Sequence, residues 1–219
     1  MIKLCIFDFD GTLCASHEAI VHCLNATFDH YDHPRPSHEI LDSYIRKSMG
    51  VAETFADLNR NGLTQEESYE WRERYRAIYN SGEGLARSTL FEGVEDILSH
   101  LKDIKIPSII LSNKGEKAVL KSLAHFNLDP HFEMVIAERD GVLLKPDPST
   151  YHELIAPKYA HIVPDEILMI GDAPPDLLYA RNIGAKSCWA RYGHGDHEKC
   201  MAYAPDYIID TLADLRSIL

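Results

Sequence analysis

Asp8 and Asp10 lie two residues apart at the end of an apolar run near the amino terminus of this 219-residue chain. Residues 4–7 favour a strand, and Gly11 favours a turn directly after it. Because residues two apart in a strand point to the same face, the two carboxylates are expected to converge beyond its carboxyl end. Carboxylates held that close repel each other, and a divalent cation with oxygen ligands, typically magnesium, is their usual stabiliser. A simple Asp-x-Asp-Gly turn is the alternative.

A second polar pair, Ser112 and Asn113, follows the apolar residues 106–111. A hydroxyl and free backbone N–H groups at the beginning of a helix form a binding site for a phosphate group. The alternative is that this pair only caps the helix that follows.

Lys145 lies between an apolar pair, Leu143 and Leu144, and the prolines Pro146 and Pro148. Pro146 favours an extended backbone at Lys145, and Pro148 favours the beginning of a helix, so the lysine is expected at a fixed position. A lone lysine is often a solvated surface charge. A compact cation fixed in this way suits the neutralisation of phosphate oxygens beside a carboxylate.

Asp172 and Asp176 follow residues 167–170, a short apolar run typical of a buried parallel strand. At a strand end and in the first turn of a helix, both carboxylates are expected to reach one cation. Asp176 alone is also explained by the helix dipole, which favours an acidic residue in the first turn. The dipole does not explain Asp172.

Taken in order, these four segments resemble the motifs of the haloacid dehalogenase-like superfamily, whose members are mostly magnesium-dependent phosphatases. The matching stretches are Asp-Phe-Asp-Gly-Thr-Leu from Asp8, Ser-Asn from Ser112, Lys-Pro from Lys145, and Gly-Asp-x-x-x-Asp ending at Asp176. The resemblance covers the whole chain. It departs at Ala173, where many members of the phosphoglycolate phosphatase type have Thr or Ser, so one auxiliary hydrogen bond is in doubt.

The resemblance implies a role for each of these residues. Asp8 is expected to be the nucleophile that forms an aspartyl-phosphate, and Asp10 the general acid and base. The phosphate-binding groups are then Ser112, the N–H groups near Asn113, and Lys145. The Mg²⁺ ligands are Asp8, the backbone carbonyl of Asp10, Asp172, and Asp176 directly or through water.

The resemblance predicts a phosphatase that acts on a small phosphorylated metabolite. The Ser-Asn-Lys and Lys-Pro-Asp-Pro stretches look most like those of phosphoglycolate phosphatases. Asp10 excludes a haloacid dehalogenase, because those enzymes lack the second aspartate. A phosphosugar mutase, a pyrophosphatase and a nucleotidase stay compatible with the motifs. A non-catalytic binding module predicts the loss of at least one catalytic group, and none is lost here.

The pattern of apolar residues predicts two regions. Residues 15–85 carry helical periodicities, the third of which stops near Asn61 and Gly62, and they resemble the helical cap domain of the superfamily. Residues 1–14 and 86–219 alternate between strand and helix signals, which predicts an α/β core with a doubly wound, Rossmann-like parallel sheet. Ligands of such sheets bind beyond the carboxyl ends of the strands.

Arg46, Lys47 and Ser48 follow the second predicted helix of the cap. In similar proteins a cap loop at this place faces the active site and selects the substrate. A solvated basic turn is the alternative.

The composition disfavours other classes of protein. With 22 basic and 34 acidic residues the net charge is −12, which disfavours nucleic acid or an anionic membrane as a partner. No apolar run approaches the ~20 residues of a membrane span, and we expect no signal peptide because the first residues already favour a strand. The sequence leaves the oligomeric state open.

Five scattered cysteines form no disulfide framework, so we expect a reduced, cytoplasmic protein. His194, His197 and Cys200 have a spacing compatible with zinc, but no fourth ligand lies nearby in the sequence. We interpret this glycine-rich stretch as a flexible surface loop.

Overall fold

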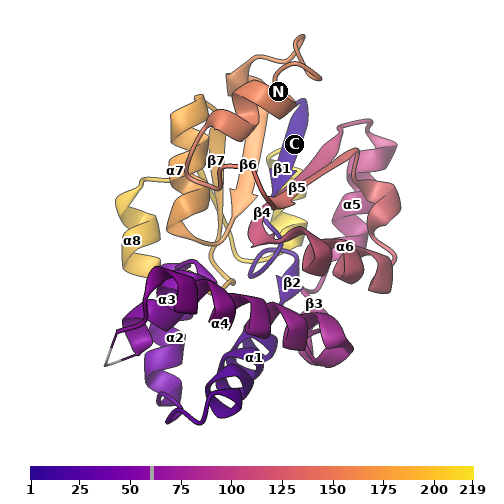
Figure 1. The fold of residues 1–219 in the computed structure, drawn as a ribbon. Helices are drawn as coiled ribbons and strands as arrows, with labels where there is room; N and C mark the ends of the chain where they lie inside the picture. Colours follow the sequence, from indigo (N-terminus) through magenta and orange to yellow (C-terminus); the bar gives the residue numbers. More distant parts are fainter. Residues whose placement is uncertain (60–61) are drawn as a thin grey trace.

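The computed structural model describes residues 1–59 and 62–219 and is shown in Figure 1. In this part of the chain, six strands form one sheet in the order β5-β4-β1-β6-β7-β8, and every neighbouring pair is parallel. The strands are β1 (Leu4–Phe7), β4 (Ser108–Gly115), β5 (Met134–Glu138), β6 (Ile167–Gly171), β7 (Lys186–Ala190) and β8 (Tyr207–Ile209). The predicted doubly wound parallel sheet is confirmed.

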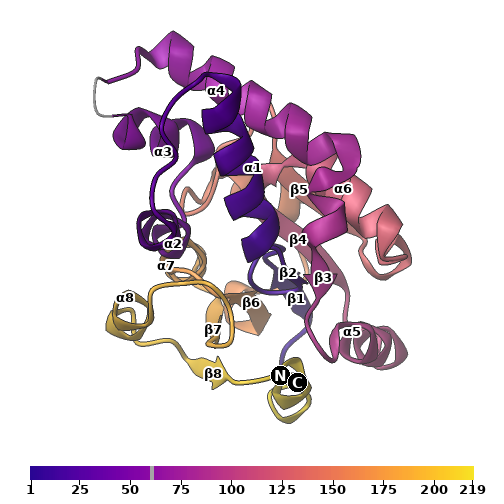
Figure 2. The same ribbon diagram turned by 90° about the horizontal axis from the view of Figure 1, so that it is seen from below.

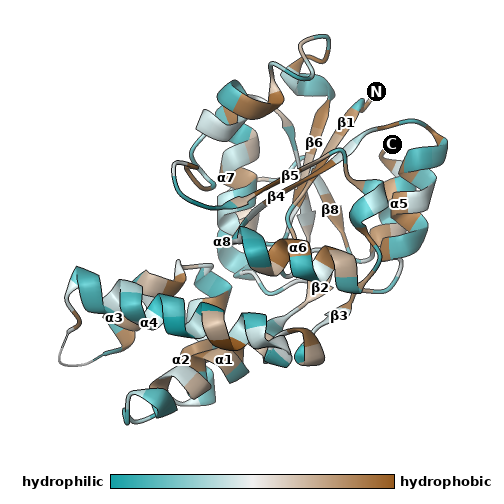
Figure 3. Ribbon diagram, turned by 45° about the vertical axis from the view of Figure 1, so that its right-hand side comes forward, coloured by the Kyte–Doolittle hydropathy of each residue, from teal (hydrophilic) through white to brown (hydrophobic). Residues whose placement is uncertain are grey.

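The central strand β1 is buried on both faces, which is why its sequence is apolar throughout rather than alternating. Cys5 and Phe7 pack on one side against the helices α5 (Val94–Asp103) and α6 (Glu116–His125). Leu4 and Ile6 pack on the other side against α7 (Pro174–Ile183) and the turn Tyr151–Ile155. Figure 3 shows the apolar colour concentrated on these inner strands.

Four helices form a separate group with its own apolar cluster, which includes Phe28, Phe55 and Trp71. These helices are α1 (His17–His30), α2 (His38–Lys47), α3 (Val51–Leu58) and α4 (Gln65–Ile78). A capping box begins α4 at Thr64, whose hydroxyl and backbone N–H both contact Glu67. The predicted end of the third helix near Asn61 lies outside the described residues.

Two short antiparallel strands, β2 (Cys14–Ala15) and β3 (Thr89–Leu90), join this helical group to the sheet. The sequence did not predict this pair, because two residues are too few for a periodic signal. In Figure 1 the pair lies between the sheet and α1–α4, and the carboxyl ends of the central strands face the helices.

The chain termini lie side by side at the other end of the sheet (Figure 2). Short helical segments complete the fold: η1 (Tyr79–Glu83), η2 (Leu85–Arg87), η3 (Asp129–His131), η4 (Tyr151–Ile155), η5 (Pro164–Glu166), α8 (His197–Ala202) and η6 (Leu212–Ser217). Among the helices described, none has the length and apolar character required to cross a bilayer.

The prediction of a flexible surface loop around His194, His197 and Cys200 was partly wrong. His197–Ala202 forms helix α8, with Asp196 as its N-cap accepting a hydrogen bond from the N–H of Lys199. Cys200 is buried and packs against Leu177 and Trp189. Asp196 is therefore the residue in the sequence that favours a helix here.

Candidate active site

Three aspartates from two strand ends form one acidic cluster. Carboxylate oxygens of Asp8, Asp172 and Asp176 all lie within 4.8 Å of one another. Asp8 follows β1, while Asp172 and Asp176 follow the neighbouring strand β6 in the loop and the first turn of α7. The cluster therefore lies at the carboxyl edge of the sheet, as the sequence predicts for a ligand site.

The cluster is destabilised by its own burial. Asp172 is 3% exposed, and burial together with the charge of Asp8 raises its pKa to about 7. Burial also raises the pKa of Asp8 and of Asp176, although the Lys145 ammonium opposes both shifts. Oxygen-only ligands with this unfavourable mutual repulsion fit a hard divalent cation, whose charge offsets it.

Lys145 is the cation that contacts this cluster in the described chain. Its Nζ lies 2.9 Å from Asp8 Oδ1 and 2.6 Å from Asp176 Oδ1, and its side chain is 2% exposed. Burial lowers the pKa of Lys145, but the attraction of Asp176 and Asp8 is larger, so the pKa is raised and the ammonium stays charged.

Asn113 fixes the backbone of Lys145. Its side-chain amide donates to the Lys145 carbonyl at 2.9 Å, and its Oδ1 accepts the Lys145 N–H at 3.0 Å. This reciprocal pair ties β4 to the loop that carries the lysine. The Asn113 side chain is therefore a positioning group here, a role that the sequence pattern did not reveal.

Ser112 is buried inside β4, four residues before α6 begins at Glu116. The N-cap of α6 is Gly115, so the alternative that Ser112 and Asn113 only cap this helix was wrong. The Ser112 hydroxyl accepts the N–H of Lys114 at 3.3 Å.

Asp10 does not join the acidic cluster through its side chain. Both of its carboxylate oxygens contact Lys114 Nζ, at 2.8 and 2.9 Å. Lys114 was not predicted as a site residue. The available signal was its place in the Ser-Asn-Lys stretch, directly after the predicted pair Ser112 and Asn113.

Asp172 is held by two backbone N–H groups of one loop and by a side-chain hydroxyl of another. Its Oδ2 accepts the N–H groups of His194 and Gly195, at 2.7 and 3.1 Å, and its Oδ1 faces the Thr12 hydroxyl at 3.3 Å. Gly11 has φ +77° and packs so closely that a Cβ there would lie 2.2 Å from Asp172 Oδ2. Any larger residue at Gly11 would displace the carboxylate.

The residues considered for zinc have separate contacts. Cys200 Sγ and the indole N–H of Trp189 approach the Asp172 carbonyl, at 3.4 and 3.1 Å. The His197 ring packs edge-on against Trp189. His194 lines the cavity described next, and burial lowers its pKa to about 4.

A cavity of about 1660 Å³ connects the strand ends to the helical group. Among the predicted site residues it is lined by Asp8, Asp10, Lys47, Ser48, Ser112, Asn113, Lys145 and Asp172. Asp176 lies behind this surface and contacts it through Lys145.

The predicted cap residues occupy different places. Lys47 and Ser48 line the cavity, whereas the backbone carbonyl of Arg46 accepts the N–H of Asp196 at 3.2 Å. Ser48 ends α2 in the left-handed conformation with φ 51°. The turn therefore contacts the core through the loop that also holds Asp172.

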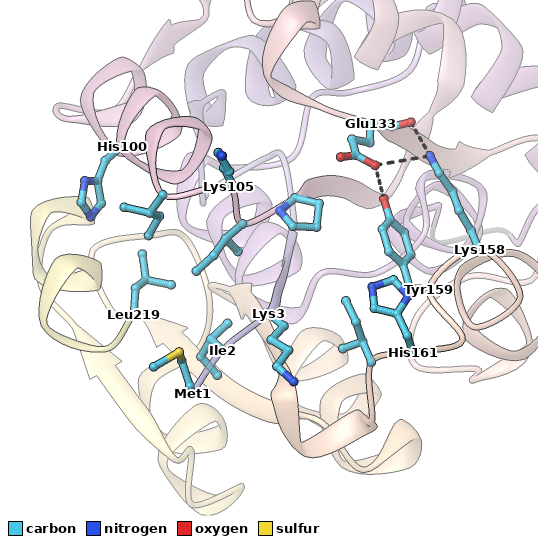
Figure 4. Close-up of a pocket in the computed structure, with 14 residues that line it drawn as sticks. Met1, Ile2, Lys3, His100, Lys105, Glu133, Lys158, Tyr159, His161 and Leu219 are labelled. Atoms are coloured by element: carbon cyan, nitrogen blue, oxygen red, sulfur yellow. Dashed lines mark hydrogen bonds and ion pairs between the residues drawn. The ribbon is translucent and has the colours of Figure 1, made fainter.

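A second cavity, of about 850 Å³, lies at the amino end of the sheet, beside both termini (Figure 4). Its lining includes Lys3, Lys158 and Tyr159 and none of the predicted site residues. The chemistry-bearing groups thus gather in the first cavity.

The family model described as haloacid dehalogenase-like hydrolase matches residues 5–190. A phosphoglycolate phosphatase of Chromobacterium violaceum is 27% identical, covering 100% of this chain and 96% of that protein. A pyrophosphatase, PpaX, of Anoxybacillus flavithermus is 28% identical, with 100% and 97% covered.

Solved structures give the same picture. A crystal structure described as a predicted phosphoglycolate phosphatase from Haemophilus somnus superposes with a TM-score of 0.87 at 25% identity, covering 99% and 97% of the two chains. A haloacid dehalogenase-like family hydrolase from Streptococcus pneumoniae has a TM-score of 0.84 at 22% identity, covering 99% and 98%, and this likeness shows the fold alone.

The family match spans most of the chain, and the relatives are enzymes of the phosphatase type. The predicted superfamily and the predicted class of enzyme are both confirmed. This chain belongs to the haloacid dehalogenase-like hydrolase family.

Proposed function

We propose that this hydrolase is a magnesium-dependent phosphatase that acts on a small phosphorylated metabolite, a phosphoglycolate-type monoester being favoured, through an aspartyl-phosphate on Asp8. The contact between Lys145 and Asp8, beside Asp172 and Asp176, carries the proposal. A carboxylate nucleophile, a neutralising cation and oxygen ligands for a metal are the groups that phosphoryl transfer requires.

In this mechanism an oxygen of Asp8 attacks phosphorus, and the bond from phosphorus to the leaving oxygen breaks. Asp10 donates a proton to that oxygen and later takes one from the water that hydrolyses the aspartyl-phosphate. The reaction returns Asp8 and releases inorganic phosphate. Splitting the displacement into two steps lowers the barrier of each.

Ser112, the N–H groups near Asn113, and Lys145 bind the oxygens of the transferring group in this proposal. Asp8, the Asp10 carbonyl, Asp172 and Asp176 are the groups that would hold Mg²⁺. When bound, the cation reduces the repulsion between the carboxylate nucleophile and the phosphate. Asn113 acts mainly by fixing Lys145, as its two hydrogen bonds to that residue indicate.

Residues 15–85 serve as the cap domain and residues 1–14 and 86–219 as the core domain in this proposal. The cap excludes water from the cavity and contacts the leaving group, and Lys47 and Ser48 are among its polar residues that line the cavity. The five cysteines, all free and buried, suit the reducing cytoplasm expected from the sequence.

A pyrophosphatase is the second candidate, because PpaX proteins are among the relatives. Phosphoglycolate and pyrophosphate differ in the leaving group and not in the phosphoryl group transferred. The same set of core residues therefore serves both reactions.

The test is release of phosphate from phosphoglycolate, pyrophosphate, nucleoside monophosphates and hexose phosphates, with Mg²⁺ and with a chelator. Phosphoglycolate is expected to react fastest, and only with Mg²⁺. Asp8→Asn should abolish turnover while the circular dichroism spectrum stays unchanged, because the amide is a poor nucleophile of the same shape. Full activity in that variant would remove Asp8 as the nucleophile, and hexose isomerisation without phosphate release would favour a mutase.

A further inference from the structure

Lys114 is a buried cation held in a fixed place at the junction of core and helical group. Its Nζ contacts both oxygens of Asp10 and lies 3.9 Å from the centre of the Tyr79 ring. The side chain is 10% exposed and lines the cavity. The Tyr79 hydroxyl contacts Ser88 at 3.2 Å, which fixes the ring that covers the ammonium.

His194 lines the same cavity and has an unused hydrogen-bonding atom. Its Nε2 is buried and has no hydrogen-bond partner among the described residues. The ring is held between His17 and Phe91, with ring centres at 5.6 and 6.2 Å. A buried polar atom without a partner is costly, and a bound ligand would satisfy it.

The contact with Asp10 assigns Lys114 to one part of the substrate. Under the proposed function, on which this inference rests, Asp10 lies within hydrogen-bond distance of the leaving oxygen. Lys114 Nζ contacts the same carboxylate, so it lies within reach of a group carried two or three atoms beyond that oxygen. Lys145, in contrast, contacts the nucleophile Asp8.

The arginines of the cavity are already paired. Arg72 and Arg76 of α4 both contact Glu138 and Glu73. Arg139 contacts Glu116. Lys114 is paired as well, but its partner is Asp10, the carboxylate assigned to the leaving oxygen. Among the described residues it is therefore the cation placed next to the leaving group in this proposal.

We propose that Lys114 and His194 form a subsite for a second anionic group on the leaving part of the substrate. The substrate class is then a phosphate ester or anhydride whose leaving group is itself negatively charged, through a carboxylate or a phosphate. Lys114 supplies the charge and His194 a hydrogen bond. A neutral alcohol as leaving group lacks the charge that pairs with Lys114 and makes a weaker hydrogen bond with His194.

The experiment compares 2-phosphoglycolate with 2-hydroxyethyl phosphate, which has a similar size and a neutral leaving group. The ratio of their kcat/KM values measures selectivity for the anion and cancels any general effect on Asp10. Lys114→Met should reduce this ratio about 10- to 100-fold, as expected for loss of a charged hydrogen bond, and Lys114→Arg should retain most of it. His194→Phe should reduce the ratio about 3- to 10-fold, and His194→Gln less.

Lys117→Met is the matched control, because Lys117 lines the cavity but is exposed. An unchanged ratio in folded Lys114→Met protein, or an equal loss in Lys117→Met, would overturn the subsite. Binding of both phosphates to the Asp8→Asn protein, measured by calorimetry, separates the two proposals. If that protein discriminates by charge through Lys114 while the wild type hydrolyses neither compound, the subsite stands and the proposed phosphatase fails.

Discussion

At the scale of single residues, the two aspartates of the first loop contact different lysines. Asp8 contacts Lys145 and Asp10 contacts Lys114. A nucleophile must be ionised and close to phosphorus, whereas a proton donor must be close to the leaving oxygen. Two separate cations allow these two carboxylates, two residues apart, to have different surroundings.

Removing the Lys145 charge should be costly for stability as well as for activity. Lys145→Met leaves Asp8 and Asp176 buried without their cation, and loss of one partner of a buried ion pair costs about 3–5 kcal/mol. We expect urea unfolding to show a loss of this order without Mg²⁺. Lys158→Met is the control, because its pair with Glu133 is exposed and should change the free energy of unfolding by less than about 1 kcal/mol.

Part of the Lys145→Met loss should be recovered with Mg²⁺, which neutralises the same carboxylates. Equal losses in the Lys145→Met and Lys158→Met proteins would show that the buried pair is not stabilising the cluster.

The acidic cluster should make the stability of the metal-free protein depend on pH. The pKa of Asp172 is raised to about 7, so the folded protein binds more protons than the unfolded chain between about pH 4 and pH 7. Stability contributed in this way is present below about pH 4 and is lost as the pH rises through 7. Mg²⁺ competes with the proton and should therefore raise the melting temperature more at pH 8 than at pH 5.

Thermal unfolding with EDTA and with Mg²⁺ at the two pH values measures this effect. Asp172→Asn is the control, since it removes the titrating group and should flatten the dependence. A Mg²⁺-induced rise that is as large at pH 5 as at pH 8 would contradict the prediction.

At the scale of elements, the turn after α4 positions the side chain that covers Lys114. Gly84 packs against the ring of Tyr79, where a Cβ would lie 2.6 Å from Cγ. Gly84→Ala should displace the ring and destabilise the fold by about 1–3 kcal/mol, as overpacking does. Gly50→Ala, whose Cβ would find no heavy atom nearer than 3.6 Å, is the matched control.

Denaturant unfolding of the two alanine variants gives the comparison. Similar midpoints for both variants would mean that the Tyr79 ring adapts freely.

The sequence predicted the site features that depend on a single strand and the residues directly after it. The apolar runs before Asp8 and before Asp172 placed these carboxylates at strand ends, because a buried strand and the turn after it are local signals. The reciprocal pair between Asn113 and Lys145, and the pair between Lys114 and Asp10, depend on how segments far apart in the chain approach each other. Local periodicity carries no information about such approaches.

The helix boundaries were less well predicted for a related reason. β4 continues through Ser112 to Gly115 with a shift of register against β5, so the expected helix begins later than the polar residues indicate. Polar residues at a strand end satisfy turn, cap and strand equally well, and pairing with β5 decides between them.

At the scale of the whole molecule, the contacts between the helical group and the core include ion pairs beside the cavity. Glu138, at the end of β5, pairs with Arg72 and Arg76 of α4. Glu138→Gln should weaken this contact, and hydrogen exchange in α4 should rise about 2- to 5-fold, as expected for a partly exposed pair.

Glu73→Gln provides the control, because Glu73 contacts the same arginines from within α4. The same rise in both variants would mean that the charges stabilise the helix and not its contact with the core.

The strand pair β2–β3 sets Cys14 opposite Leu90 and Ala15 opposite Thr89, so the chain enters the helical group and leaves it at adjacent points. The chain between β2 and β3 forms one continuous insertion. Its length and shape do not affect the register of the six-stranded sheet. A different insertion between the same two strands would face the same carboxylates of the core. Proteins built in this way can therefore change the residues that contact the substrate by replacing one continuous stretch. The groups of the core stay in place.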